Sequence, residues 1–286
     1  MSDRTKIEWT SATWNPTTGC DRVSSGCDHC YALTLARRLK AAGNPRYQVD
    51  GDPRRSGPGF GLTLHWDKID QPLRWRTPRF VFVDSMSDLF HADVPIEFIE
   101  RVFKVMARAS QHRFQILTKR PGRMASVLRR LCSDPLPNVW LGTSVENQHW
   151  AKIRIPKLLE TPAAVRFLSC EPLLGPLDIT AWLQQRDGIG REASGTNGLR
   201  SIDWVIVGGE SGPRHRPMLP DWARSVRDQC EAAAVPFFFK QWGGRTPKAG
   251  GRLLDGRVWD EVPGRTTVLK SAATPSSSPP VPSRPS

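Results

Sequence analysis

Three cysteines lie close together near the start of the chain, at Cys20, Cys27 and Cys30. Thiols at such short spacing are typical of a metal site. Three protein ligands leave one coordination position open, and an open position distinguishes a metal that takes part in chemistry from one that only supports the fold. The spacing therefore predicts a reactive metal centre on one loop.

Two kinds of metal centre fit these cysteines. A [4Fe-4S] cluster held by three thiolates has one iron without a protein ligand, and this iron can chelate S-adenosylmethionine, which an electron from the cluster then cleaves to give a carbon radical. A structural zinc is the alternative, and it would need a fourth ligand such as His29 or a distant cysteine. His29 lies between two of the expected ligands, where it could bind the same ion only with difficulty. We therefore expect the iron–sulfur cluster.

The elements that must position this loop follow a repeated pattern. Short apolar runs lie at residues 7–14, 80–83, 114–117, 139–141, 165–168, 204–207 and 236–239. Between them, apolar residues recur at helical spacing, as at Ile96, Ile99, Val102, Phe103 and Met106. Buried strands that alternate with amphipathic helices predict parallel β/α units in one barrel or one open sheet.

Each of these apolar runs is followed by polar residues that can do chemistry. In a β/α barrel the carboxyl ends of all strands meet at one face, where ligands bind, so we expect one shared site there. The strand ends offer these candidates: Lys119 as an anchor for an anion, Ser144, Glu171 and Glu210 as polar contacts to a cofactor, and Cys170 as a hydrogen-atom donor. Each also has a simpler interpretation, because Lys119 could begin a helix, the carboxylates could accept structural hydrogen bonds, and Cys170 could be a buried free thiol.

The composition indicates the compartment and the kind of partner. The formal net charge is +13, which suits an anionic partner such as DNA or RNA, or serves only to keep the protein in solution. There is no apolar run of membrane-spanning length and no apolar signal segment, so we expect a cytoplasmic protein with reduced thiols and no membrane partner. Residues 264–286 are rich in Pro and Ser, which predicts a disordered tail after a single domain at residues 1–263.

Several segments in combination resemble a known family. They lie at residues 14–20, 26–32, 84–90, 117–121, 141–146, 169–174, 208–212 and 239–243. From about residue 6 to residue 263, the chain resembles the uncharacterised phage and prophage family marked by a three-cysteine motif. That family is similar, more distantly, to radical S-adenosylmethionine enzymes of the spore photoproduct lyase branch.

The resemblance implies a fold and a set of cofactors. The fold would be a partial, six-stranded β/α barrel, with a [4Fe-4S] cluster on Cys20, Cys27 and Cys30, bound S-adenosylmethionine and an external electron donor. Ser85 and Asp88 would lie near the methionine part of that cofactor. The chain departs from the superfamily in two places, because its cysteine spacing is six then two residues rather than three then two, and because Gly-Gly-Glu, here ending at Glu210, follows a late strand rather than the second.

We therefore expect a radical S-adenosylmethionine enzyme that acts on nucleic acid and is associated with mobile elements. The alternative is a zinc-stabilised nucleic-acid-binding protein without enzymatic activity. The two differ in the metal that the anaerobically purified protein contains.

Overall fold

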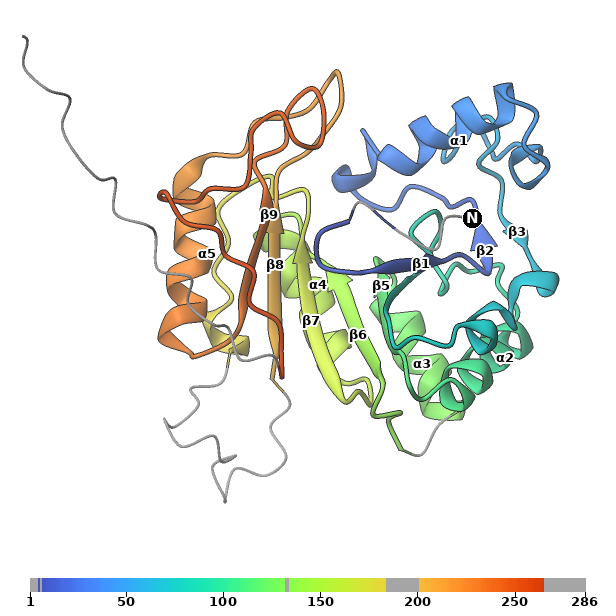
Figure 1. Cartoon of the computed structure of the whole chain (residues 1–286). Helices are drawn as coiled ribbons and strands as arrows, with labels where there is room; N and C mark the ends of the chain where they lie inside the picture. The colour runs from blue at the N-terminus through green and yellow to red at the C-terminus, as the bar shows by residue number, and fades with distance from the viewer. Residues whose placement is uncertain (1–4, 6, 132–133, 184–200, 265–286) are drawn as a thin grey trace, which may run out of the picture.

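The computed structural model describes residues 5, 7–131, 134–183 and 201–264. Its centre is a curled sheet of seven parallel strands in the order β1-β4-β5-β6-β7-β8-β9, with helices on its convex side (Figure 1). The strands are β1 (Ala12–Trp14), β4 (Phe80–Val83), β5 (Arg113–Thr118), β6 (Val139–Ser144), β7 (Val165–Cys170), β8 (Trp204–Gly208) and β9 (Phe237–Gln241). The predicted partial β/α barrel is confirmed, with one strand more than the six that the resemblance implied. The expected disordered tail lies outside the described residues from residue 265 onward.

In the described part of the chain, five α-helices accompany the sheet: α1 (Tyr31–Ala41), α2 (Ile96–Arg108), α3 (Pro121–Leu131), α4 (Gln148–Leu159) and α5 (Pro220–Ala232). In α2 the residues at helical spacing face the sheet, and Phe98, Ile99 and Val102 are fully buried. This apolar face explains why α2 packs against the convex side. None of the described helices has the length and apolar character needed to cross a bilayer.

The remaining regular structure is short. β2 (Thr17–Thr18) and β3 (Thr63–Leu64) form a small antiparallel pair. Single turns of 3-10 helix lie at Ser25–Cys27, Pro45–Tyr47, Trp66–Lys68, Gln71–Arg74 and Thr180–Trp182. The first of these turns belongs to the loop that carries the three cysteines, residues 20–30, which we call the cysteine loop.

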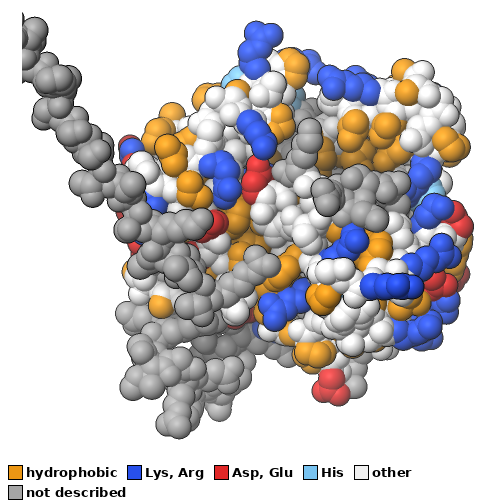
Figure 2. Space-filling view, viewed as in Figure 1, with side chains coloured by type: hydrophobic (Ala, Val, Ile, Leu, Met, Phe, Trp, Pro, Cys, Tyr) orange, Lys and Arg blue, Asp and Glu red, His pale blue; other side chains and the backbone are white. Residues whose placement is uncertain are grey.

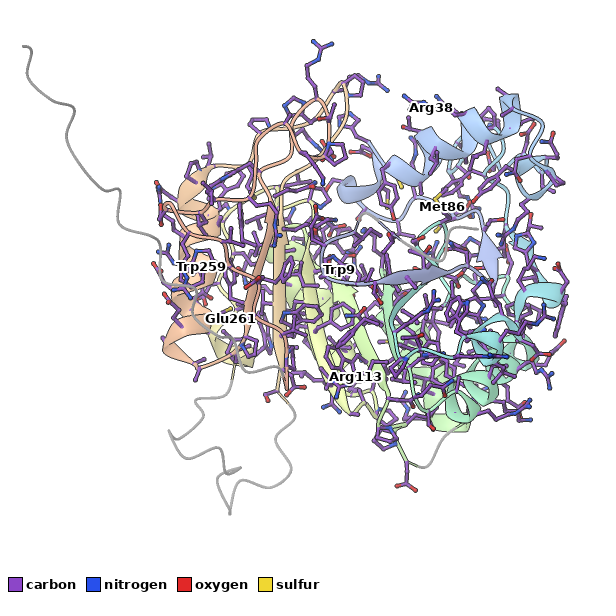
Figure 3. All side chains as sticks on the ribbon, viewed as in Figure 1. Trp9, Arg38, Met86, Arg113, Trp259 and Glu261 are labelled. Carbon is purple, nitrogen blue, oxygen red and sulfur yellow. The ribbon has the colours of Figure 1, made fainter. Side chains whose placement is uncertain are left out.

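Side chains of the strands alternate between two apolar clusters, one on each face of the sheet. The larger cluster fills the space between the sheet and its helices. On the concave face, an aromatic layer closes the inside of the barrel, and it consists of Trp9, Phe82, Trp140, Phe167, Trp204 and Phe238. Figure 3 shows Trp9 inside the curve of the sheet. The aromatic layer lies below the end of the barrel where the strands finish.

The first strand is shorter than the sequence predicts. We expected a strand through residues 7–14, but β1 begins at Ala12, because the chain turns at Ile7, whose carbonyl accepts a hydrogen bond from the backbone N–H of Thr10 at 3.3 Å. This turn brings the Trp9 ring to 4.6 Å from that of Phe82, measured between ring centroids. Residues 7–14 thus form a turn that places Trp9 inside the barrel, followed by a short strand.

Candidate metal and cofactor site

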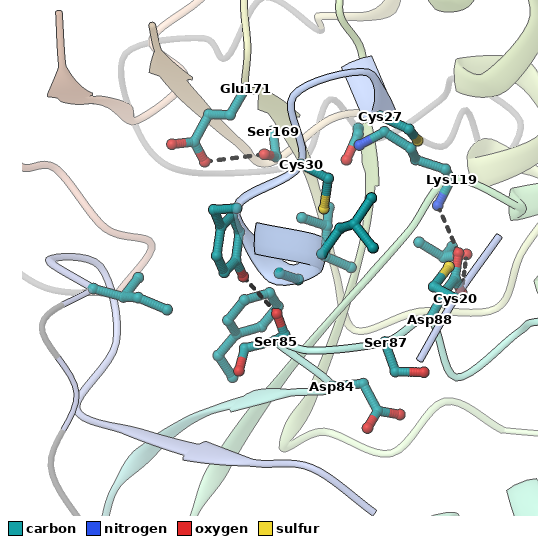
Figure 4. Close-up of a pocket in the computed structure, with 18 of the residues that line it drawn as sticks. Cys20, Cys27, Cys30, Asp84, Ser85, Ser87, Asp88, Lys119, Ser169 and Glu171 are labelled. Carbon is teal, nitrogen blue, oxygen red and sulfur yellow. Dashed lines mark hydrogen bonds between the residues drawn. The ribbon is translucent and has the colours of Figure 1, made fainter. Parts of the chain in front are cut away.

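A cavity of about 690 Å³ opens at the carboxyl ends of the strands. Trp9, Phe82 and Leu117 supply apolar side chains to its wall, and the cysteine loop and the start of α1 lie along one side (Figure 4). Cavities of this size are typical of sites for drug-sized ligands and cofactors. The structure therefore brings the strand ends together at one site, as the parallel pattern predicts.

All three cysteines of the loop line this cavity. Cys27 ends the 3-10 turn, and Cys30 is the residue that precedes α1. Burial raises the pKa of Cys20 to about 12 and also raises the pKa of Cys30. The Arg120 guanidinium, 3.5 Å from the Cys20 sulfur, opposes that rise. The Cys20 and Cys30 thiols are thus protonated in the free protein, and a metal would have to displace their protons.

The donor set fits an iron–sulfur cluster. Within the described ranges, no three His, Cys, Asp or Glu side chains form a group that could hold a metal ion. A single zinc needs its ligands to converge on one point about 2 Å away, whereas the cysteines of a cubane cluster bind different iron atoms. Three thiols beside a large cavity are the type of donor that an iron–sulfur cluster uses. His29, the alternative zinc ligand, directs its Nδ1 at the Glu210 carboxylate, 2.9 Å away.

Asp88 lines the cavity, but its carboxylate is already engaged by protein groups. Its Oδ1 accepts a hydrogen bond from Thr118 Oγ1 at 2.7 Å, and its Oδ2 accepts one from Arg120 Nη1 at 2.8 Å. Arg120 in turn donates to the carbonyl oxygen of Asp21 at 3.1 Å. These contacts make Asp88 a support for Arg120 beside Cys20, a role that the sequence did not indicate.

Ser85 and Lys119, two further predicted contacts, also lie on the cavity wall. The Ser85 hydroxyl donates to Asn15 Oδ1 at 3.1 Å, and its carbonyl oxygen accepts from the Tyr31 hydroxyl at 2.5 Å. The Lys119 ammonium lies 3.7 Å from Glu146 Oε1. Both residues thus share the cavity wall with the three cysteines.

Ser144 and Glu171 complete the predicted set on the cavity wall. Glu171 accepts a hydrogen bond from the Ser169 hydroxyl at 3.0 Å and lies 3.0 Å from Lys240 Nζ. Lys240 and Ser169 line the cavity as well. This part of the cavity wall therefore offers hydroxyl, ammonium and carboxylate groups in one small area.

Two predicted site residues lie elsewhere. Cys170 is fully buried in the cluster between the sheet and its helices, because side chains alternate along β7 and Ser169, not Cys170, faces the cavity. Burial raises the pKa of the Cys170 thiol, and its position does not suit a hydrogen-atom donor to a ligand in the cavity. Glu210 is not among the residues that line the cavity, because Arg216 and His29 hold its carboxylate.

Asp84, directly after β4, gives the site a pH-dependent stability. Its Oδ1 accepts a hydrogen bond from the Thr17 backbone at 3.0 Å, whereas its Oδ2 has no hydrogen-bond partner among the described residues. Figure 4 shows the carboxylate pointing away from the cysteine side chains. Burial raises the pKa of Asp84 from 3.8 to about 8, against the hydrogen bonds from Thr17. The folded state thus binds this proton more tightly than the unfolded state does.

We expect Asp84→Asn to remove this pH dependence. Between about pH 4 and about pH 8, Asp84 ionises in the unfolded chain but stays protonated in the folded protein. The unfolding free energy of the wild type should therefore fall by up to about 1.4 kcal/mol per pH unit relative to that of the variant. Asn tolerates the positive φ of 57° at this position. Urea unfolding of both proteins at about pH 5 and about pH 8 measures the difference. Parallel stability profiles would show that Asp84 is ionised in the folded protein.

The fold and the site together define an α/β protein with a curled parallel sheet and a three-cysteine loop beside a cavity at its strand ends. The chain belongs to the family described as "Protein of unknown function (DUF5131)", whose model matches residues 4–263. No curated protein matches the sequence.

Among solved structures, the chain has weak similarity to spore photoproduct lyase. A cysteine-to-serine mutant of that enzyme is 11% identical with a TM-score of 0.44, covering 80% of this chain and 63% of the other. Spore photoproduct lyase complexed with dinucleoside spore photoproduct is 10% identical with a TM-score of 0.43, covering 82% and 65%. This chain therefore matches less than two thirds of the length of either structure.

Proposed function

We propose that this protein is a radical S-adenosylmethionine enzyme, with a [4Fe-4S] cluster on Cys20, Cys27 and Cys30 and S-adenosylmethionine in the adjoining cavity. The observation that carries the proposal is the convergence of all three cysteines on the wall of one cavity at the carboxyl ends of parallel strands. When bound, the cluster and its cofactor supply a carbon radical that can take a hydrogen atom from a substrate.

The residues of the chain would hold and shield these groups. Arg120, fixed by Asp88, places a positive charge beside Cys20, which stabilises a thiolate there. Ser144, Lys119 and Glu171 offer polar contacts to the amino, carboxylate and ribose groups of the cofactor. The aromatic layer closes the inner end of the cavity and keeps bulk water from that side.

Cofactor cleavage tests the proposal directly. Protein purified without oxygen, loaded with iron and sulfide and reduced with dithionite should convert S-adenosylmethionine to 5′-deoxyadenosine, as measured by liquid chromatography. The same protein without reductant is the control, since the cleavage consumes an electron. A preparation with its full complement of iron and sulfide that produces no 5′-deoxyadenosine would overturn the assignment.

We also propose that the substrate is nucleic acid and that the enzyme is cytoplasmic, encoded by phage or other mobile elements, and dependent on a separate electron donor. The net charge of +13 supports an anionic partner. On the face shown in Figure 2, Lys and Arg side chains are commoner than Asp and Glu. Arg22 and Lys248 line the cavity, and neither forms an ion pair with another described residue.

Charge reversal at the cavity should therefore weaken nucleic-acid binding. We expect binding of a labelled DNA or RNA oligonucleotide, followed by fluorescence anisotropy, to fall steeply with salt as condensed counterions are released. The pair Arg22→Glu and Lys248→Glu should weaken it about tenfold at low salt. The control pair, Arg130→Glu and Lys152→Glu, changes exposed residues of α3 and α4. Equal weakening by both pairs would contradict a binding site at the cavity.

A further inference from the structure

The cysteine loop reaches from one edge of the sheet to strands near the other edge. β1, which precedes the loop, is an edge strand, and β8 is next to the opposite edge strand, β9. Figure 1 shows the start of α1 turned toward the loops that follow β8 and β9. The six residues between Cys20 and Cys27 therefore have a structural use, because this longer spacing lets the loop contact the far side of the barrel.

Glu146, two residues after the end of β6, makes the first of these contacts. Its carboxylate is fully buried and accepts a hydrogen bond from the Ser24 hydroxyl at 2.5 Å and one from Arg154 Nη1 at 2.8 Å. The loop packs so closely here that a Cβ on Gly26 would lie 2.3 Å from Glu146 Oε1. This side of the loop thus rests on a buried ion pair and requires a glycine.

Glu210 and Arg216, in the segment after β8, make the second contact. The Arg216 guanidinium binds both carboxylate oxygens, with Nη2 2.5 Å from Oε1 and Nε 3.0 Å from Oε2. The same Nη2 donates to the carbonyl oxygen of Ser25 at 2.8 Å, and His29 Nδ1 lies 2.9 Å from Glu210 Oε2. The cysteine loop is therefore held on both sides of Cys27 by one carboxylate–guanidinium pair, which we call the Glu210–Arg216 clamp.

The backbone around Glu210 is itself fixed. A Cβ on Gly209 would lie 1.9 Å from the carbonyl oxygen of Trp242, so this turn packs directly on the segment after β9. The Gly244 backbone donates to the Glu210 carbonyl oxygen at 3.0 Å. Burial alone would raise the pKa of Glu210, but hydrogen bonds from Arg216 and His29 outweigh it and hold the pKa below its usual value. The carboxylate is thus charged and rigidly placed.

We infer that Glu210 and Arg216 are positioning residues that hold the cysteine loop across the open barrel, so that Cys27 and Cys30 keep their places before any metal is bound. In treating these cysteines as cluster ligands, the inference rests on the proposed function. The clamp itself needs no metal, because all of its contacts are between protein groups.

The test uses the reduced, metal-free full-length chain. Glu210→Gln should make amide hydrogen exchange in residues 21–30 and alkylation of Cys27 and Cys30 by iodoacetamide about tenfold faster, as measured by mass spectrometry. Arg216→Lys keeps the positive charge but loses the bidentate contact with Glu210. It should therefore increase the same exchange and alkylation rates by a smaller factor. Asp255→Asn is the matched control, because Asp255 binds Arg224 and Arg227 away from the loop.

The buried Cys230 separates a local effect from a general one. Faster alkylation confined to Cys27 and Cys30 would support the clamp, whereas an equal rise at Cys230 would show that Glu210 only supports the fold and would overturn the inference. If Glu210→Gln and Asp255→Asn have the same rates of hydrogen exchange and alkylation in the cysteine loop, the inference is overturned as well. If the wild-type chain fails to assemble a cluster, the alkylation result still stands, so failure of the proposed function and failure of the clamp are distinguishable.

Discussion

Replacing Cys27 with Ala should reduce the iron and sulfide content of anaerobically reconstituted protein at least about tenfold and abolish cleavage of S-adenosylmethionine, because a cubane cluster depends on each of its thiolates. The same result is expected for Cys20→Ala and Cys30→Ala, since all three cysteines line the cavity. Iron and sulfide analysis, together with assay of 5′-deoxyadenosine, measures the effect.

A fourth variant serves as the control for these three. Cys230 is fully buried between the sheet and α5, so Cys230→Ala removes a thiol without touching the cavity. This variant should keep its iron content and its activity. Its unfolding free energy should fall only slightly, because a small void replaces the buried thiol. Equal iron content in Cys27→Ala and Cys230→Ala would mean that the cysteine loop does not hold the metal.

Removing Glu146 should produce the largest loss of stability at the site. Arg154 is only 2% exposed, and Glu146 is its charged partner. Burial lowers the pKa of Arg154, and Glu146 opposes that effect. Glu146→Ala would leave a buried guanidinium without its counter-charge, which costs about 3–5 kcal/mol of unfolding free energy. Ser24 would also lose its acceptor, so the cysteine loop should loosen in the same variant.

Glu160→Ala offers a matched comparison for Glu146→Ala. Glu160 follows α4 and pairs with Lys157 and Arg129, but all three side chains are largely exposed. Solvent screens such pairs, so this variant should unfold at nearly the same urea concentration as the wild type. If both variants shift the urea midpoint equally, the Glu146–Arg154 pair is no more important than a surface ion pair.

The sequence predicted the scaffold well because its signals are local. Each of the seven apolar runs corresponds to a strand of the sheet, because buried parallel strands are typically short apolar segments in the sequence. The cavity followed from the same pattern, since the carboxyl ends of parallel strands must meet at one edge. Ser85, Lys119, Ser144 and Glu171 all line this cavity, and their role as cofactor contacts stays a prediction.

The sequence could not predict which polar side chains would bind other groups of the protein and which would be left to contact a ligand. Glu210 meets His29, 181 positions away, only because the sheet curls enough to bring the segment after β8 to the cysteine loop. The position of Cys170 was within reach of sequence reasoning, since alternation along β7 places Phe167 and Ser169 on the concave face and Leu168 with Cys170 on the other. The Trp9 ring packs against Phe82, Phe167 and Trp204, three residues far away in the sequence, and no local pattern contains these contacts.

Metal analysis of wild-type protein purified without oxygen tests the central claim most directly. The measurement is iron, acid-labile sulfide and zinc per chain, made on the same sample. The account predicts about four iron and about four sulfide per chain after reconstitution, with little zinc. About one zinc per chain with no sulfide would contradict it and would favour the zinc-stabilised nucleic-acid-binding protein instead.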